Sequence, residues 1–281
     1  MIEVLVEPLQ FSFMVRALVA VVIVGATCGV LGAFVVLRGL AFMGDAIAHA
    51  VFPGVVIAFM LKTSLILGGL IFGVLTAIGI GVIARSRRVG EDSAIGILFA
   101  GAFALGVVLI STSRTYSRDL ASFLFGNILA VSPFDLASIA AVALLTIAVL
   151  VFFEKELVLV SFDREVADAM GYPIFRLDLM LLVLIALTIV VAIQAVGNVL
   201  VLALLVTPSA TARLLTNRLR PMIVVGALIG ALSGAVGLYI SYYGEVAAGG
   251  AIVLVATAIF FVALGLTTFM RRREYTRSTA R

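Results

Sequence analysis

Charged side chains are scarce in this chain. Of its 281 residues only 12% are Asp, Glu, Lys or Arg, whereas 64% are hydrophobic. A soluble globular domain carries about 25% charged and roughly 45–50% apolar residues. Because no water-soluble fold can bury so much apolar surface, the composition excludes a soluble globular protein and predicts a membrane protein.

Cysteine and histidine each occur once, as Cys28 and His49. A lone cysteine excludes a disulfide within the chain and a cysteine-rich metal site. A lone histidine excludes the H-E-x-x-H motif of a metalloprotease. The chain also lacks the phosphate-binding loop G-x-x-x-x-G-K-[ST], and its lysines are Lys62 and Lys155. We therefore expect no enzymatic activity in this chain, and any nucleotide-driven work requires a separate ATPase subunit.

The apolar residues form long unbroken runs rather than the alternating pattern of a transmembrane β-barrel. The runs that approach the length of about 20 residues needed to cross a bilayer are predicted transmembrane helices. They are Phe13–Leu37, Ala41–Leu61, Leu65–Ala84, Ala94–Ser111, Phe134–Phe153, Leu177–Val196, Val199–Ala212, Met222–Ser241 and Gly250–Met270.

Two of these runs are irregular. Ala41–Leu61 contains Asp45, His49 and Pro53, and Val199–Ala212 is short and contains a proline. Either could be a broken or partly re-entrant helix. The predicted fold class is therefore all-α: a polytopic membrane protein of about 8–9 transmembrane helices. Residues 1–281 are expected to form a single transmembrane domain.

Basic residues gather at the ends of the apolar runs, which is the pattern of a topology signal. By the positive-inside rule, the loop Glu154–Arg176, the C-terminus and three clusters of arginine are predicted to be cytoplasmic. Arg114 and Arg118 break the rule. The net charge of +4 thus reflects topology, and no nucleic-acid partner is expected. The clusters are Arg85, Arg87 and Arg88; Arg213, Arg218 and Arg220; and Arg271, Arg272, Arg273 and Arg277.

Glycines recur at four-residue intervals in several runs, a spacing that lets membrane helices approach closely. We expect most of them to mediate contacts within the helix bundle, with a subunit interface as the alternative. They are Gly25 and Gly29; Gly69 and Gly73; and Gly226, Gly230 and Gly234.

Asp45 and His49 stand four residues apart in the apolar segment Gly44–Gly54. On a helix this spacing places both side chains on one face. Ionisable groups in lipid are costly and mark functional sites. A carboxylate and an imidazole form half of a site for a first-row transition metal. The alternative is a buried ion pair that only fixes helix packing.

The polar stretch at residues 161–173 predicts a short helix with Asp163 as its N-cap and Gly171 as its C-terminal stop. Two turns of exposed helix are not stable alone, so this helix must dock on a partner or on its own membrane domain. The apolar side chains that offer a ridge to a partner groove are Phe162, Val166 and Met170.

Four segments resemble, in order, the signatures of one family, the permeases of bacterial metal-ion ABC importers for manganese, zinc and iron. Gly44–Gly54 resembles its G-D-[AT]-x-[AS]-H-[AS]-x-x-P-G signature. Glu91–Ile97 is similar to its E-D-[ST]-A-I-G segment, and Ser161–Gly171 to the F-D-x-x-x-A-x-x-x-G pattern of its coupling loop. Gly197–Leu215 resembles its late membrane signature. The resemblance covers nearly the whole chain.

The resemblance implies a permease subunit in the bacterial cytoplasmic membrane. It would form a dimer with a second copy or a paralogous permease, sit on cytoplasmic ATPase subunits and receive metal from an extracytoplasmic solute-binding protein. No permanently bound cofactor is implied, because the ion is cargo. By the same resemblance Asp45 and His49 are the metal ligands. Asp163, Ala167 and Gly171, within the coupling loop 154–176, transmit ATPase closure.

Two-fold symmetry would present the Asp45/His49 pair twice and so complete a four-ligand site. Oxygen and nitrogen ligands without thiolate suit manganese, iron or zinc better than copper(I). Pro53 and Gly54 resemble the manganese/iron branch of the family, so manganese is the first choice of cargo. A proton- or sodium-coupled transporter is one alternative, but it leaves the loop helix without a partner. A siderophore or cobalamin permease is another, but its large ligand has little use for an Asp/His pair.

Overall fold

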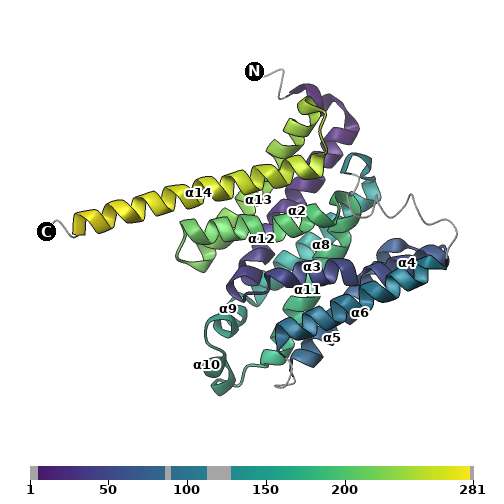
Figure 1. Ribbon diagram of the computed structural model, residues 1–281, viewed down its shortest axis with the longest axis horizontal. Coiled ribbons are helices and arrows are strands. Elements are labelled where there is room, and N and C mark those ends of the chain that lie inside the picture. The colour runs from purple at the N-terminus through teal and green to yellow at the C-terminus, as the bar shows by residue number, and fades with distance from the viewer. Residues whose placement is uncertain (1–5, 86–89, 113–127, 279–281) are drawn as a thin grey trace.

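The computed structural model describes residues 6–85, 90–112 and 128–278, and throughout these ranges the regular elements are helices (Figure 1). Nine helical segments of the described chain are long and apolar enough to cross a membrane, which confirms the predicted all-α polytopic fold. Arg87, Arg88, Arg114 and Arg118 lie outside the described residues.

The elements run in chain order from a short 3-10 helix to a long C-terminal helix. They are η1 (Glu7–Gln10), α2 (Ser12–Leu37), α3 (Ala41–Ala50), α4 (Phe52–Met60), α5 (Leu65–Ala84), α6 (Glu91–Ser111), η2 (Ile128–Ala130), α8 (Pro133–Phe152), α9 (Glu154–Phe162), α10 (Arg164–Ala169), α11 (Ile174–Val196), α12 (Asn198–Leu215), α13 (Leu219–Gly244) and α14 (Ala248–Ser278).

The two irregular runs fold differently: one is broken into two helices and the other is a single helix. The run Ala41–Leu61 is broken at Val51 into α3 and α4, because Pro53 has no N–H to offer the carbonyl of His49 one turn earlier. The pair still counts as one candidate span, Ala41–Met60. The run predicted as Val199–Ala212 extends over all of α12 and is long enough to span, with Pro208 inside it. The count is therefore nine candidate spans in the described chain rather than eight.

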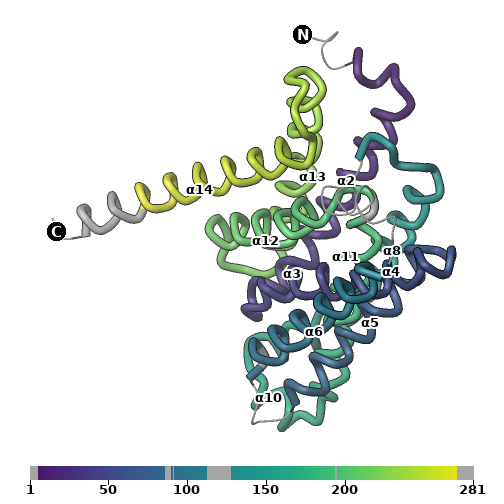
Figure 2. The backbone as a smooth tube through the Cα atoms, turned by 45° about the vertical axis from the view of Figure 1, so that its right-hand side comes forward, coloured from purple at the N-terminus to yellow at the C-terminus, as the bar shows by residue number. Residues whose placement is uncertain are grey.

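Two helices organise the core. α2 packs against α12 and α13, and α11 packs against α5 and α8 (Figure 1). Their large side chains are fully buried, among them Phe34 on α2 and Ile185 and Ile189 on α11. α14 lies along α12 and α13 near its start, and its C-terminal part projects away from the other helices in both views (Figure 2). Exposed apolar side chains on α14, among them Phe261, Val262 and Leu266, suit a lipid or protein environment rather than water.

The glycine intervals on α2 and α13 mark a close helix crossing. A side-chain carbon added at Gly25 would overlap the carbonyl of Gly230, and one added at Gly29 would overlap the carbonyl of Gly226. Small residues are needed because the two backbones are in contact. This confirms, for these four positions, the prediction of contacts within the bundle.

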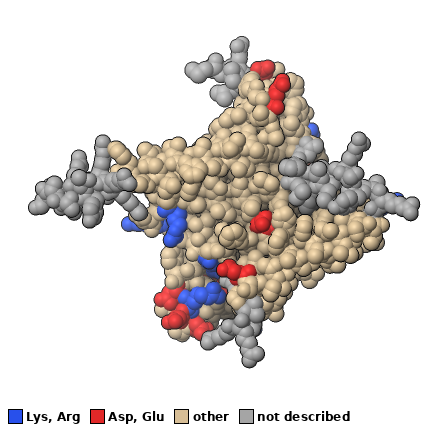
Figure 3. Space-filling model, in the orientation of Figure 1, with Lys and Arg blue, Asp and Glu red and all other residues tan. Residues whose placement is uncertain are grey.

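One end of the molecule collects charged side chains around α9 and α10 (Figure 3). Arg220 at the start of α13 pairs with Glu154 at 2.8 Å. Arg85, which follows α5, lies over the ring of Phe175, 5.2 Å from its centroid. Basic residues from two predicted clusters therefore lie on the same side as the loop Glu154–Arg176, as their charge pattern predicts.

Candidate functional site

Asp45 and His49 lie one turn apart on α3, as their spacing predicts. The Nε2 atom of His49 is 3.3 Å from Oδ1 of Asp45. The side chain of His49 is 25% exposed and that of Asp45 is 41% exposed. Their neighbours Ala46, Ile47, Ala48 and Ala50 are buried. The two polar groups thus share the open face of a helix whose other faces are in the core.

Aromatic rings from α6 enclose His49 on one side. The rings of Phe99 and Phe103 each lie with their centroids 5.4 Å from the imidazole, at 63° and 84° to its plane. These edge-on contacts limit the rotation of the imidazole and shield it from solvent. His49 is therefore held in place by packing, and its Nε2 atom lies beside Asp45.

A third polar side chain reaches the pair from α12. The Nδ2 atom of Asn198 is 3.3 Å from Nε2 of His49, and Asn198 is only 5% exposed. Gly197, with φ of 83°, separates α11 from α12 and allows the chain to turn at this point. Sequence reasoning did not assign Asn198 to the site. The available signal was the Gly-Asn pair between two apolar runs.

The described residues contain no group of three or more His, Cys, Asp or Glu side chains that could hold a metal ion. Within this part of the chain, Asp45 and His49 therefore supply one carboxylate and one imidazole and no further ligand of these kinds. The pair can bind a divalent transition-metal ion only weakly by itself, since such ions take at least four ligands. The exposed side of Asp45 leaves room for ligands from elsewhere.

The predicted loop helix is present as α10. The Asp163 side chain caps it by accepting a hydrogen bond from the N–H of Val166 at 2.9 Å, and Gly171 ends it with φ of 79°. Phe162, Val166 and Met170 are 66%, 44% and 63% exposed. All three residues of the predicted apolar ridge are therefore on the surface, but Phe162 is the last residue of α9, whereas Val166 lies in α10 and Met170 directly follows it.

The three residues that the resemblance assigns to ATPase coupling have distinct places in this loop. Asp163 is the N-cap, Gly171 is the C-terminal stop and Ala167 is fully buried in the main core. Ala167 thus packs the helix against its own bundle, and the surface that a partner can touch is the ridge of Phe162, Val166 and Met170. The coupling role of these residues stays a prediction.

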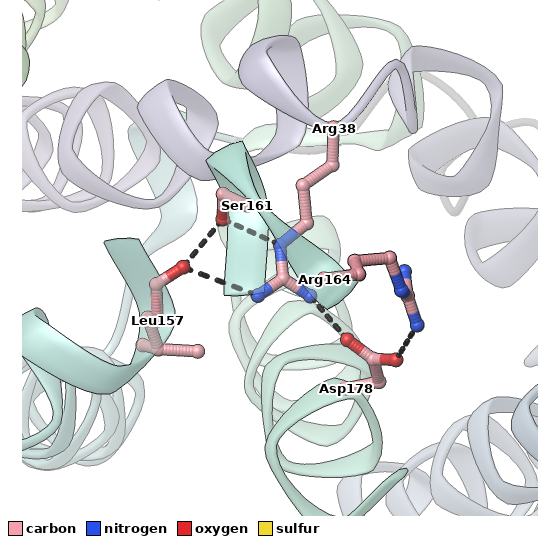
Figure 4. Close-up of polar contacts among 5 residues, drawn as sticks. All are labelled: Arg38, Leu157, Ser161, Arg164 and Asp178. Carbon is pink, nitrogen blue, oxygen red and sulfur yellow. Dashed lines mark hydrogen bonds and ion pairs between the residues drawn. The ribbon is translucent and has the colours of Figure 1, made fainter. Parts of the chain in front are cut away.

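A network of ionic hydrogen bonds ties α10 to the membrane helices (Figure 4). Arg38, which follows α2, donates to Asp178 on α11 at 2.6 Å and to Ser161 on α9 at 2.8 Å. Arg164, the first residue of α10, donates to the second oxygen of the same Asp178 carboxylate. The carboxylate therefore bridges two arginines that are remote in sequence.

The position of Arg38 connects this network to α3. Its side chain is 8% exposed, and Arg38 stands three residues before Ala41, the first residue of α3. The network thus joins α10, through Asp178, to a residue just before the helix that carries Asp45 and His49. Sequence reasoning missed the network because its members come from four helices, and nothing local in the sequence relates Arg38 to Asp178.

Comparison with known proteins gives a family and several relatives. The profile of the ABC 3 transport family matches residues 10–267. The manganese transport system membrane protein MntC of Halalkalibacterium halodurans is 48% identical over 255 residues, which are 91% of this chain and 87% of that protein. The manganese import system permease protein ScaB of Streptococcus gordonii is 42% identical over 90% of this chain and 91% of that protein.

Two further similarities concern an iron transporter and a solved structure. The chelated iron transport system membrane protein YfeD of Yersinia pestis is 39% identical over 92% of this chain and 86% of that protein. A structure of PsaBC from Streptococcus pneumoniae in complex with Fab has a TM-score of 0.83 and 41% identity. The structural match covers 94% of this chain and 95% of the chain in that structure.

Proposed function

The chain belongs to the ABC 3 transport family, and from that premise we propose that it is the membrane-spanning permease subunit of an ATP-driven importer of divalent transition-metal ions. Manganese is the first choice of cargo, because relatives at 48% and 42% identity are named as manganese transport proteins. Iron is the second candidate, since YfeD, at 39% identity, is named for chelated iron transport. Zinc is supported only by the general chemistry of the ligands.

The observation that carries this proposal is the 3.3 Å approach of the Asp45 carboxylate and the His49 imidazole on the open face of α3. A second permease related by a two-fold axis would bring an identical pair to the same ion. Two carboxylates and two imidazoles make a complete first-row metal site without thiolate. Such a site suits cargo of manganese or iron rather than copper(I), because thiolates would favour softer metals.

ATP hydrolysis is proposed to reside in a separate cytoplasmic subunit that docks on α10. The exposed ridge of Phe162, Val166 and Met170 offers an apolar surface to a groove on that subunit. The basic side chains Arg85 and Arg220 lie at the same end of the molecule. By the positive-inside rule this end and the C-terminus are cytoplasmic, and metal arrives from a solute-binding protein on the opposite side.

Uptake by the purified permease and its ATPase in proteoliposomes tests the proposal. We expect ATP-dependent accumulation of Mn²⁺ that is lost in both Asp45→Ala and His49→Ala, with assembly and basal ATP hydrolysis retained. Parallel measurements with Fe²⁺ and Zn²⁺ rank the cargo. Uptake without ATP, driven by a proton gradient, would instead identify a secondary transporter. Unchanged uptake in both variants would refute the metal role of the pair.

A further inference from the structure

We propose that Asn198 is an additional, oxygen-donating ligand of the transported ion and that it biases the site toward Mn²⁺ over Zn²⁺. The inference rests on the proposed function and adds to it a third ligand from each permease chain. It assigns a metal-binding role to a residue on a different helix from Asp45 and His49. The site is then formed by α3 and α12 together.

The first argument is the unsatisfied polar atom of Asn198. The side chain is 5% exposed, and its Oδ1 is buried without a hydrogen-bond partner. A buried acceptor without a donor costs about 1–3 kcal/mol. A cation is a partner that this oxygen can take, because a carboxamide oxygen is a metal ligand of the same hard type as a carboxylate.

The second argument is distance. Nε2 of His49 is 3.3 Å from Oδ1 of Asp45 and 3.3 Å from Nδ2 of the Asn198 carboxamide. Metal–ligand bonds of about 2.0–2.2 Å place neighbouring donor atoms roughly 3.0–3.5 Å apart in octahedral or tetrahedral sites. The separation of Asp45 and His49 therefore matches that between neighbouring ligands of one ion, and the position now held by Nδ2 of Asn198 lies at the same distance from Nε2.

The carboxamide can present either end to His49. A half turn about its last torsion exchanges the nitrogen and the oxygen, which are similar in size. The Oδ1 atom then occupies the position 3.3 Å from Nε2 that Nδ2 occupies in this structure. An arriving cation favours that orientation, because it repels the NH₂ group and attracts the oxygen.

The chemistry of the added ligand points to Mn²⁺. Carboxylate, carbonyl and water ligands suit manganese, which takes octahedral oxygen-rich sites, whereas imidazole and thiolate ligands suit zinc. One amide oxygen from each of two permeases raises the share of oxygen ligands and the coordination number. Loss of Asn198 should therefore weaken Mn²⁺ more than Zn²⁺.

Metal binding to the complete, nucleotide-free transporter tests the inference without relying on transport. Free Mn²⁺ is measured by electron paramagnetic resonance, and Zn²⁺ affinity by competition. For Asn198→Ala we expect Mn²⁺ affinity to fall by about 10–100-fold, the range seen when a metal site loses a supporting group. We expect a smaller fall for Zn²⁺. Asn198→Asp, which keeps an oxygen at this position, should restore Mn²⁺ binding.

Ser233→Ala is the matched control, because Ser233 is also a buried polar residue with an unpartnered oxygen but lies on α13, which packs against α2, α12 and α14. Equal losses of Mn²⁺ and Zn²⁺ in Asn198→Ala would mean that Asn198 only orients His49, which overturns the inference. Unchanged Mn²⁺ affinity also overturns it. If Asp45→Ala and His49→Ala bind Mn²⁺ normally, the proposed function itself fails, and this outcome is distinct from the other two.

Discussion

The chemistry of the candidate site depends on how few polar groups share it. Asp45 supplies a carboxylate, and His49 supplies an imidazole that packs on one side against Phe99 and Phe103. In an apolar segment a carboxylate without a cation or hydrogen-bond donors is strongly disfavoured. The exposed fraction of Asp45, 41%, shows that its side chain lies on the surface of this chain rather than in the packed core.

Asp45→Asn removes the charge while keeping the shape of the side chain and one oxygen. We expect Mn²⁺ affinity to fall by at least about 10-fold, because the amide lacks the electrostatic attraction that a carboxylate exerts on a divalent ion. Titration of Mn²⁺ into the assembled transporter measures the change. The fold should be unaffected, since Asp45 is not part of the core, and an unaltered thermal midpoint checks this. Wild-type affinity in this variant would contradict a role for the charge.

Among the helices, α10 has one buried and one exposed side. Ala167 is fully buried, whereas Val166 and Met170, at 44% and 63%, are open to a partner. The capping bond from Asp163 and the left-handed turn at Gly171 define its two ends. The sequence predicts these ends well because capping depends on residues within a few positions of each other.

Cysteine cross-linking distinguishes the two sides of α10. In a chain whose native Cys28 is replaced by alanine, Met170→Cys should cross-link to cysteines on the ATPase subunit, because its side chain points outward. Ala167→Cys should not, because its side chain is in the core. Gel electrophoresis under non-reducing conditions gives the yield. Strong cross-linking at position 167 and none at 170 would show that α10 docks with the opposite face.

Arg38 links α10, α11 and the start of α3 through Asp178. Arg38→Met keeps the aliphatic stem but removes the charge, so Asp178 is left with Arg164, which is 58% exposed. We expect a loss of about 1–3 kcal/mol in stability, because Oδ1 of Asp178 loses a hydrogen bond between two charged groups. Uptake per ATP hydrolysed should also fall, since the connection between α10 and α3 is weakened.

Thermal unfolding in detergent and the ratio of uptake to hydrolysis measure these two effects. Arg220→Met is the matched control, because Arg220 also pairs with a carboxylate between two helices but is 77% exposed. Exposed pairs contribute little, so this variant should change both quantities less. Equal effects in the two variants would argue against a special role for the buried network.

The whole chain forms only part of the proposed ion path. The described residues bring together one carboxylate, one imidazole and one carboxamide, all from a single copy. Under the proposed function a second permease completes the site. The fold of this chain is shared with a structure of PsaBC in complex with Fab, which matches 94% of the chain at a TM-score of 0.83. The functional unit is therefore proposed to be a dimer with its site at the symmetry axis.

A shared site has a fixed stoichiometry. We expect one high-affinity Mn²⁺ for every two permease chains, because each chain contributes half of the ligands. Metal analysis of the purified transporter after removal of excess ion, together with protein quantification, measures the ratio. A ratio of one ion per chain would show that each permease binds its own ion, and the two-fold arrangement of ligands would then be wrong.

The sequence by itself determined the fold class, the positions of the membrane spans, the two ends of α10 and the Asp45/His49 pair. These depend on local properties: runs of apolar residues, capping residues and a four-residue spacing. Tertiary structure alone decided that Ala167 is buried, that Arg38 meets Asp178 and that Asn198 reaches His49. Asn198 and His49 are 149 positions apart. Contacts of this kind follow from how helices pack, and no local pattern in a single sequence encodes which helices become neighbours.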